Sequence, residues 1–258
     1  MSPARKRGAT PRFYAEPPPG LDTSDLSGHL IVVEGADGSG RSTQVALLKE
    51  WLESVGWAVQ TTGLRRSNLL ARDIDAALAK NTATRMTLAL MYATDFFDQL
   101  EHRIIPALRS GFVVLADRYI FTLIARAAVR GVDRRYLQGI YSVAVRPDMT
   151  FRLKVRPRVA FEREFRKNRV VSFWESGRDM YLAENPYDSF VKYQGMLRKE
   201  FDLMALGNAF VAVEGEASVL RVNAILRHHV AKLLGIKRTR YKPSPGLLSP
   251  LIAPQPSP

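Results

Sequence analysis

The chain has 258 residues, 46% of them hydrophobic, and a formal net charge of +13. It contains no cysteine, which excludes disulfides and thiolate metal sites and favours an intracellular, cytoplasmic setting. No apolar run approaches the roughly 18 residues of a membrane span, and the basic run Arg5-Lys6-Arg7 is not followed by the apolar segment of a secretory signal. The length allows one large α/β domain or two small ones.

The positive charge predicts a partner that carries phosphate. Nucleic acid and small phosphates are both candidates, because basic side chains bind either one. Part of the charge lies in the two tails and part in a cluster from Arg152 to Arg169, with no basic arm that alternates with aromatic residues. This distribution favours small phosphates, with contact to nucleic acid as a possible side effect.

Composition divides the chain into three parts. Residues 1–28 are rich in Pro, Arg and Gly, and we expect a disordered leader there. Residues 29–235 alternate between apolar and amphipathic runs, which predicts one folded domain. Residues 236–258 are rich in basic residues, Pro and Ser, and we expect a disordered tail.

The first motif of the domain is a glycine-rich loop, Gly35-Ala-Asp-Gly-Ser-Gly-Arg-Ser-Thr43. It follows the apolar run 29–33 and precedes an amphipathic run that ends near residue 55. This strand–loop–helix context is that of a phosphate-binding P-loop, G-x-x-x-x-G-K-[ST], with Arg41 in the place of the usual Lys. The glycines allow the main-chain N–H groups to approach phosphate oxygens, and the helix directs its positive dipole end at them.

The loop therefore predicts ATP and Mg²⁺ as ligands. Ser42 has the hydroxyl that ligates the metal in such loops. Arg41 is expected to supply the cation at the β- and γ-phosphates, although a planar guanidinium is not equivalent to an ammonium. The residues expected to bind ATP are Gly35, Asp37, Gly38, Ser39, Gly40, Arg41, Ser42 and Thr43.

The rest of the domain alternates between strands and helices. We expect strands at 56–62, 112–116, 149–155 and 209–213. We expect helices at 69–80, 84–109, 121–129, 134–145, 157–166, 189–206 and 219–234. Pro106 is expected to kink the second of these helices, and residues 167–180 are expected to form a mobile loop. This order predicts one parallel sheet with helices on both faces. Ligands of such sheets lie at the carboxyl ends of the strands. Asp37 and the pair Asp117-Arg118 both follow strand ends, so we expect them to face one cleft.

These residues suit phosphoryl transfer, which needs positioning, cations and Mg²⁺. Asp117 is expected to orient the metal or its waters, and Arg118 to hold an acceptor phosphate; the alternative is a salt bridge at the strand end. Later arginines are candidates to close over the transferring group, or else they form a solvated cationic helix face. These are Arg163, Arg166, Arg169 and Arg178.

The motifs together resemble the thymidylate kinase family of P-loop nucleoside monophosphate kinases. The resemblance rests on the P-loop with Asp at its third position, on Val113-Val-Leu-Ala-Asp-Arg-Tyr119, on Pro147-Asp148 before a strand, and on the turn 214–218. It implies a three-layer P-loop fold, transfer of the γ-phosphoryl group of ATP to dTMP with Mg²⁺, and a homodimer. It also implies that Asp37 reaches the acceptor sugar and that the turn 214–218 contacts adenine.

The acceptor site departs from the family pattern. Where the family has an Arg that grips the acceptor phosphate, this chain offers Arg65 or Arg66. Where the family has an aromatic residue that stacks on thymine and an Arg four residues later that reads the base, this chain has Tyr92 and Phe96. Both can equally belong to a helix core stripe. Two alternatives to a dTMP kinase therefore stay open: a kinase for another small acceptor, and a nucleotide-binding regulatory paralogue with little or no turnover.

Overall fold

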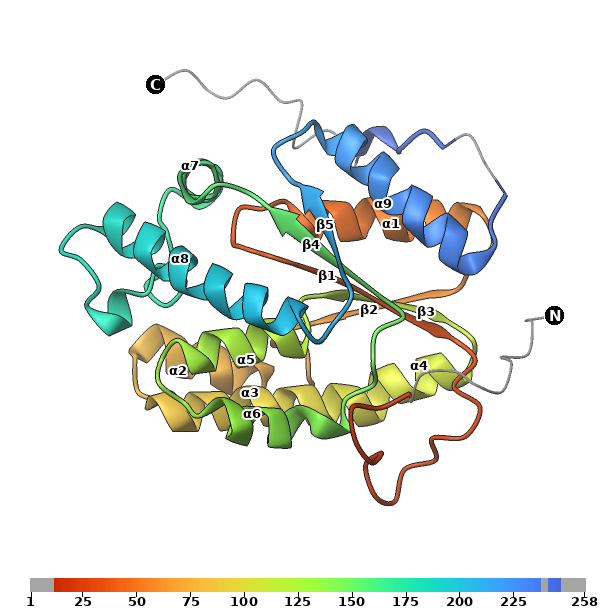
Figure 1. Ribbon diagram of the computed structural model, residues 1–258, viewed down its shortest axis with the longest axis horizontal. Coiled ribbons are helices and arrows are strands. Elements are labelled where there is room, and N and C mark those ends of the chain that lie inside the picture. The colour runs from red at the N-terminus through yellow and green to blue at the C-terminus, as the bar shows by residue number, and fades with distance from the viewer. Residues whose placement is uncertain (1–11, 238–240, 247–258) are drawn as a thin grey trace.

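The domain is built on one parallel sheet. A computed structural model describes residues 12–237 and 241–246. The five strands of its sheet are β1 (His29–Gly35), β2 (Val59–Gly63), β3 (Val113–Asp117), β4 (Met149–Lys154) and β5 (Phe210–Glu214), in the order β2-β3-β1-β4-β5. Helices cover both faces of the sheet (Figure 1). The predicted three-layer α/β architecture is confirmed.

Two helices cover one face of the sheet. They are α1 (Arg41–Ser54) and α9 (Val219–Leu234), which pack beside each other (Figure 1). Alternate strand residues, such as Ile31 and Val33 on β1 and Phe151 on β4, point toward them and are fully buried. Because α1 begins where β1 has just ended, the intervening loop is held between a buried strand and a buried helix.

The other face is covered by more helices. They are α2 (Ala71–Lys80), α3 (Arg85–Gln99), α4 (Ile105–Arg109), α5 (Ile120–Ala128), α6 (Arg134–Ile140) and α8 (Pro186–Ala205). A π-helical turn, Leu100–Ile104, interrupts the helix expected at 84–109 just before Pro106, whose ring nitrogen has no hydrogen to donate to the preceding turn. The helix expected at 134–145 ends at Ile140 and continues as a 3₁₀ turn, Tyr141–Val143.

A further helix, α7 (Pro157–Asn168), follows β4 at the carboxyl edge of the sheet. The segment from 169 to 185 that joins α7 to α8 is irregular apart from one short 3₁₀ turn, Arg178–Met180. The loop expected at 167–180 therefore begins two residues later, because α7 extends to Asn168. Within the described residues, no helix is long and apolar enough to span a membrane.

Residues 12–28 have defined contacts, unlike the disordered leader expected for 1–28. Phe13 is buried and pairs with Val145, and Arg12 forms a salt bridge of 2.8 Å with Asp148. At the other end, the hydroxyl of Tyr241 donates to Glu50 on α1 at 3.1 Å. Residues 1–11, 238–240 and 247–258, where most of the two predicted tails fall, lie outside the described residues.

Candidate active site

The glycine-rich loop has the backbone shape that its sequence predicts. Gly38 and Gly40 have φ angles of 74° and 89°, in the left-handed region that side chains disfavour. A Cβ atom at Gly38 would also collide with the carbonyl of Ala160 on α7. The loop therefore needs glycine at position 38 for two reasons, conformation and space, and it passes directly into the first turn of α1.

Arg41 folds back into this loop. Its side chain is 9% exposed, and one terminal nitrogen donates to the carbonyls of Gly35 and Ala36. Its Nε donates to Asp117 at 3.0 Å, and its other terminal nitrogen lies 3.4 Å from Asp37. The guanidinium thus links the loop to the end of β3, which an ammonium with a single nitrogen cannot do in the same way.

Ser42 and Asp117 form the candidate Mg²⁺ site. The hydroxyl of Ser42 donates to Asp117 at 2.6 Å. Burial favours the neutral carboxyl of Asp117, but the charges of Arg41 and Arg118 and the hydrogen bond from Ser42 outweigh it and lower its pKa. Two hard oxygen ligands fit Mg²⁺, which in such sites completes its shell with water and phosphate oxygens. Among the described residues, no cluster of three or more acidic or histidine side chains could hold a metal ion without such water and phosphate ligands.

The turn between β3 and α5 sets the position of Arg118. Arg118 has a φ of 72°, which is rare for a residue other than glycine. Its main-chain N–H donates to the carbonyl of Val33 at 3.0 Å. Glu34 accepts from the N–H groups of Tyr119 and Thr122 at 2.9 and 3.3 Å, so it caps α5 from the neighbouring strand. Complete burial raises the pKa of Glu34 despite these bonds.

Asp37 is the centre of a cluster of cations. It forms an ion pair with Arg118, and its carboxylate lies 3.0 Å from Arg126 and 3.4 Å from Arg41. Arg126 also reaches Glu175 at 3.4 Å. Burial alone would raise the pKa of Asp37, but the three guanidinium groups hold it well below its ordinary range. Asp37 is therefore an ionised acceptor at neutral pH.

Three charged residues of the site were not predicted from the sequence: Glu34, Arg126 and Glu175. Arg126 had a signal, because it is the one charged residue in the α5 sequence Ile-Phe-Thr-Leu-Ile-Ala-Arg-Ala-Ala. A lone charge on an apolar helix that faces the sheet is expensive unless it has a partner. Glu34 had a weaker signal, as a carboxylate at the end of a buried strand. Glu175 lies in the segment after α7 and had none.

Most of the predicted site residues surround one cleft of about 770 Å³. Its lining includes the loop from Asp37 to Gln44, Arg65, Asp117, Arg118, Arg163, Arg166, and Gly215 and Ala217 from the turn expected near adenine. Gly35 lies at the edge of a neighbouring cavity instead. Arg169 ends α7 in a left-handed conformation and lines neither the cleft nor this neighbouring cavity, and Arg178 lies over the ring of Phe173 at 5.6 Å.

Arg65 and Arg66 have different surroundings. The side chain of Arg65 reaches Asp75 on α2 at 2.6 Å, and its main-chain N–H donates to the buried Asp95. The guanidinium of Arg66 lies beside Gly63 at the end of β2 and lines the cleft. Within the described residues, Arg66 has no ion-pair partner. Of the two, Arg66 is the better placed to hold a phosphate.

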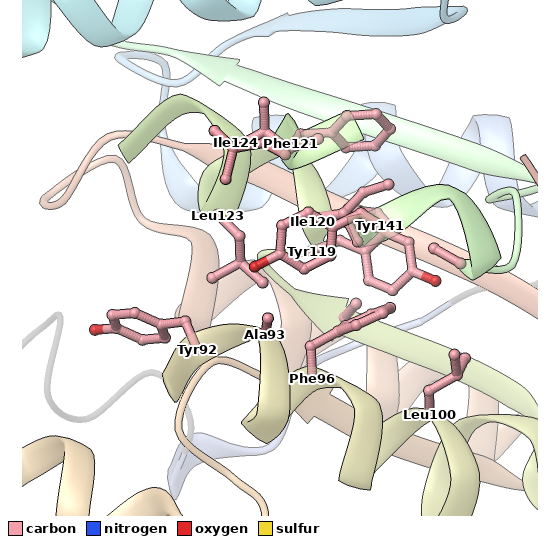
Figure 2. Packing of buried hydrophobic residues seen from close by; sticks show 14 of the residues in the cluster. Tyr92, Ala93, Phe96, Leu100, Tyr119, Ile120, Phe121, Leu123, Ile124 and Tyr141 are labelled. Carbon is pink, nitrogen blue, oxygen red and sulfur yellow. The ribbon is translucent and has the colours of Figure 1, made fainter. Parts of the chain in front are cut away.

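Tyr92 and Phe96 are separated although they share one helix. Figure 2 shows Phe96 directed into a group of rings and Tyr92 directed away from it. Phe96 packs edge-on against Tyr119 and Tyr141 with centroids 5.4 and 5.5 Å apart, as a core residue does. Tyr92 lines a small cavity of about 40 Å³ that also includes Trp174 from the segment after α7. Tyr92 thus stays a candidate for base stacking, whereas Phe96 belongs to the core stripe.

Comparison with known proteins gives one consistent result. The profile of the family described as "Thymidylate kinase" matches residues 33–201. "Probable thymidylate kinase 2" of Saccharolobus solfataricus is 38% identical over 212 residues, which cover 81% of this chain and 97% of that protein. "Probable thymidylate kinase" of Pyrococcus abyssi is 30% identical over 73% of this chain and 92% of that protein. "Thymidylate kinase" of Caldicellulosiruptor saccharolyticus is 34% identical over 54% of this chain and 70% of its own length.

Proposed function

The chain belongs to the thymidylate kinase family and is a phosphotransferase, and we propose that it transfers the γ-phosphoryl group of ATP to dTMP. One observation carries the proposal. A single cleft contains the P-loop and the Ser42–Asp117 pair, which suit a metal-bound triphosphate, together with Arg118 and Asp37, which suit an acceptor monophosphate and its sugar. A phosphoryl donor and acceptor need to meet in line in this way.

On the donor side, the amides of the loop and the amino end of α1 are proposed to bind the β- and γ-phosphates. Ser42 and Asp117 would hold Mg²⁺, which neutralises charge as the phosphoryl group leaves the donor. Arg41 already contacts Asp37 and Asp117. It would need only to exchange its bonds with the loop carbonyls for bonds with phosphate oxygens.

On the acceptor side, Arg118 is proposed to bind the phosphate of dTMP. Its Nε is buried and has no hydrogen-bond partner among the described residues, which is costly unless a ligand supplies an acceptor. Asp37, kept ionised by its three guanidinium neighbours, would accept a hydrogen bond from a sugar hydroxyl. Arg163 and Arg166 on α7 line the same cleft and are proposed to close over the transferring group.

A coupled assay of ADP release with a panel of nucleoside monophosphates tests the proposal. We expect turnover with dTMP that collapses in Asp37→Ala and Arg118→Ala and persists in Arg158→Ala, an exposed control on α7. Preference for another monophosphate would favour the kinase for a different acceptor. ATP binding without turnover on any acceptor would contradict the proposal and favour a regulatory protein, an alternative that no observation here supports.

A homodimer in the cytoplasm completes the proposal. Met86 and Leu90, one helical turn apart on α3, are 43% and 42% exposed. Apolar side chains in such a row suit a helix–helix contact between two copies. Light scattering after size-exclusion chromatography should give twice the monomer mass, and Leu90→Arg should reduce it to one monomer.

A further inference from the structure

Strand β4 contains two cationic residues, Arg152 and Lys154, although a strand covered on both faces is expected to be apolar. Phe151 and Leu153 point into the core formed with α1 and α9, as expected. Arg152 points to the opposite face, where it bonds to Asp202 on α8 at 2.6 Å and lies over the ring of Phe201. Strands covered on both faces are usually apolar on both. Because such departures from the pattern gather at functional sites, this part of the sheet needs its own explanation.

A cavity of about 310 Å³ lies at this position, between the end of β4, α5 and α8; we call it the α5–α8 cavity. The two helices pack side by side on this face of the sheet (Figure 1). The walls include the apolar side chains of Leu153, Leu197 and Phe201, and Gln194 adds a buried amide. A volume near 300 Å³ with apolar walls and a few polar groups is typical of small-molecule sites.

The lining of the cavity has an excess of positive charge. It contains six cationic and three acidic side chains, and part of this set is already paired, as in the bond of 2.7 Å between Arg156 and Glu216. Lys154 forms no ion pair within the described residues, although Glu214 is its neighbour across the strands. Arg198 reaches Asp202 only at 3.9 Å. Lys154 thus has no ion-pair partner among the described residues and Arg198 has only a long one, and both side chains are exposed at the edge of the cavity.

We propose that the α5–α8 cavity binds a small organic molecule that carries a phosphate group, beside the nucleotide cleft, with which the cavity shares Asp37 and Arg118. The phosphate would lie against Lys154 and Arg198 at the mouth, and the organic part against Leu153, Leu197 and Phe201. Arg126 lines the cavity and also bonds to Asp37. An occupant would therefore lie next to a residue that contacts the proposed acceptor site.

Titration of phenyl phosphate, followed by methyl NMR of Leu153 and Leu197, tests the proposal on the full chain. The nucleotide cleft is first filled with an adenosine–thymidine bisubstrate polyphosphate and Mg²⁺. We expect saturable shifts of both leucines, with weaker binding of inorganic phosphate, which lacks an apolar part. Lys154→Ala/Arg198→Ala should weaken binding about tenfold or more, since two charged contacts are lost. Lys199→Ala, an exposed neighbour on α8 outside the cavity, should bind like wild type.

The proposal is overturned if the leucine signals do not shift, or if the double variant binds as wild type does. If the double variant fails to fold, Lys154→Gln alone must weaken binding relative to Lys199→Ala. Because the two leucines line the α5–α8 cavity and not the nucleotide cleft, this readout does not depend on bisubstrate binding. Failure of the bisubstrate to bind would count against the proposed kinase function instead.

Discussion

Arg41→Lys separates the structural role of the guanidinium from its role toward phosphate. The Arg41 guanidinium makes five polar contacts, with the carbonyls of Gly35 and Ala36, the hydroxyl of Ser39, and the carboxylates of Asp37 and Asp117. An ammonium has three donors, and they diverge from one nitrogen. The loss of about two hydrogen bonds, at about 1 kcal/mol each, predicts a loss of about 2 kcal/mol in the free energy of unfolding.

For a domain of this size, that loss corresponds to a decrease in Tm of about 4–8 °C. Differential scanning fluorimetry measures it, with Arg158→Lys on the exposed face of α7 as a control that should change little. In the coupled assay, we expect kcat to rise or to stay unchanged, because a lysine there is what P-loops generally use for the β- and γ-phosphates.

Two results would refute this reasoning. An unchanged Tm would mean that the contacts of the guanidinium with the loop contribute nothing to stability. A large loss of kcat in a folded Arg41→Lys variant that still binds ATP would mean that catalysis depends on the guanidinium itself, and that the loop is built around it.

The other predictions follow from the same contacts. Asp117→Asn should weaken Mg²⁺ binding, seen as a higher Mg²⁺ concentration for half-maximal turnover; an unchanged requirement would exclude Asp117 as a ligand. Arg118→Ala should lower kcat/KM for the acceptor by about 100-fold or more, the scale of a lost transition-state contact. Phe96→Ala should cost about 3–5 kcal/mol of stability in urea unfolding, as for other buried rings; a small cost with altered base preference would contradict its core assignment. The lowered pKa of Asp37 stabilises the fold above its unfolded pKa near 3.9. The stability difference between wild type and Asp37→Asn should therefore shrink as the pH falls below about 4, and a constant difference would contradict it.

The parts of the site that the sequence predicted are those set by local structure. The loop 35–43 joins one strand to one helix, and the left-handed conformations of Gly38 and Gly40 follow from this local sequence. The close approach of Gly38 to Ala160 on α7 is the part that the local sequence does not predict. Asp117 and Arg118 were predicted because a strand end in a parallel sheet has only one edge to face. These residues line one cleft because the strands of a parallel sheet end at the same edge. The alternation of strands and helices in the sequence already predicted such a sheet.

The parts that were missed depend on distant contacts. Glu175 meets Arg126 across 49 residues, and Arg12 meets Asp148 across 136. No periodicity predicts such pairs. Arg126 stood out as a lone charge on an apolar helix, but nothing in the sequence indicated that Glu175 is its partner. Phe96 shows the opposite case. Its helical spacing fitted both a base-binding role and the core, and only the rings of Tyr119 and Tyr141 decide between them.

The charge balance around Asp37 indicates why this site suits an anion. Arg41, Arg118 and Arg126 all approach one carboxylate. Burial, together with the charges of Arg126 and Arg41, lowers the pKa of Arg118, which means that its charged form is disfavoured where it lies. The protein without ligand thus keeps mutually repelling cations in a partly buried cleft. If the proposed acceptor phosphate binds at this cluster, it relieves the repulsion, and part of the free energy that folding spent on the cluster returns as affinity for the nucleotide.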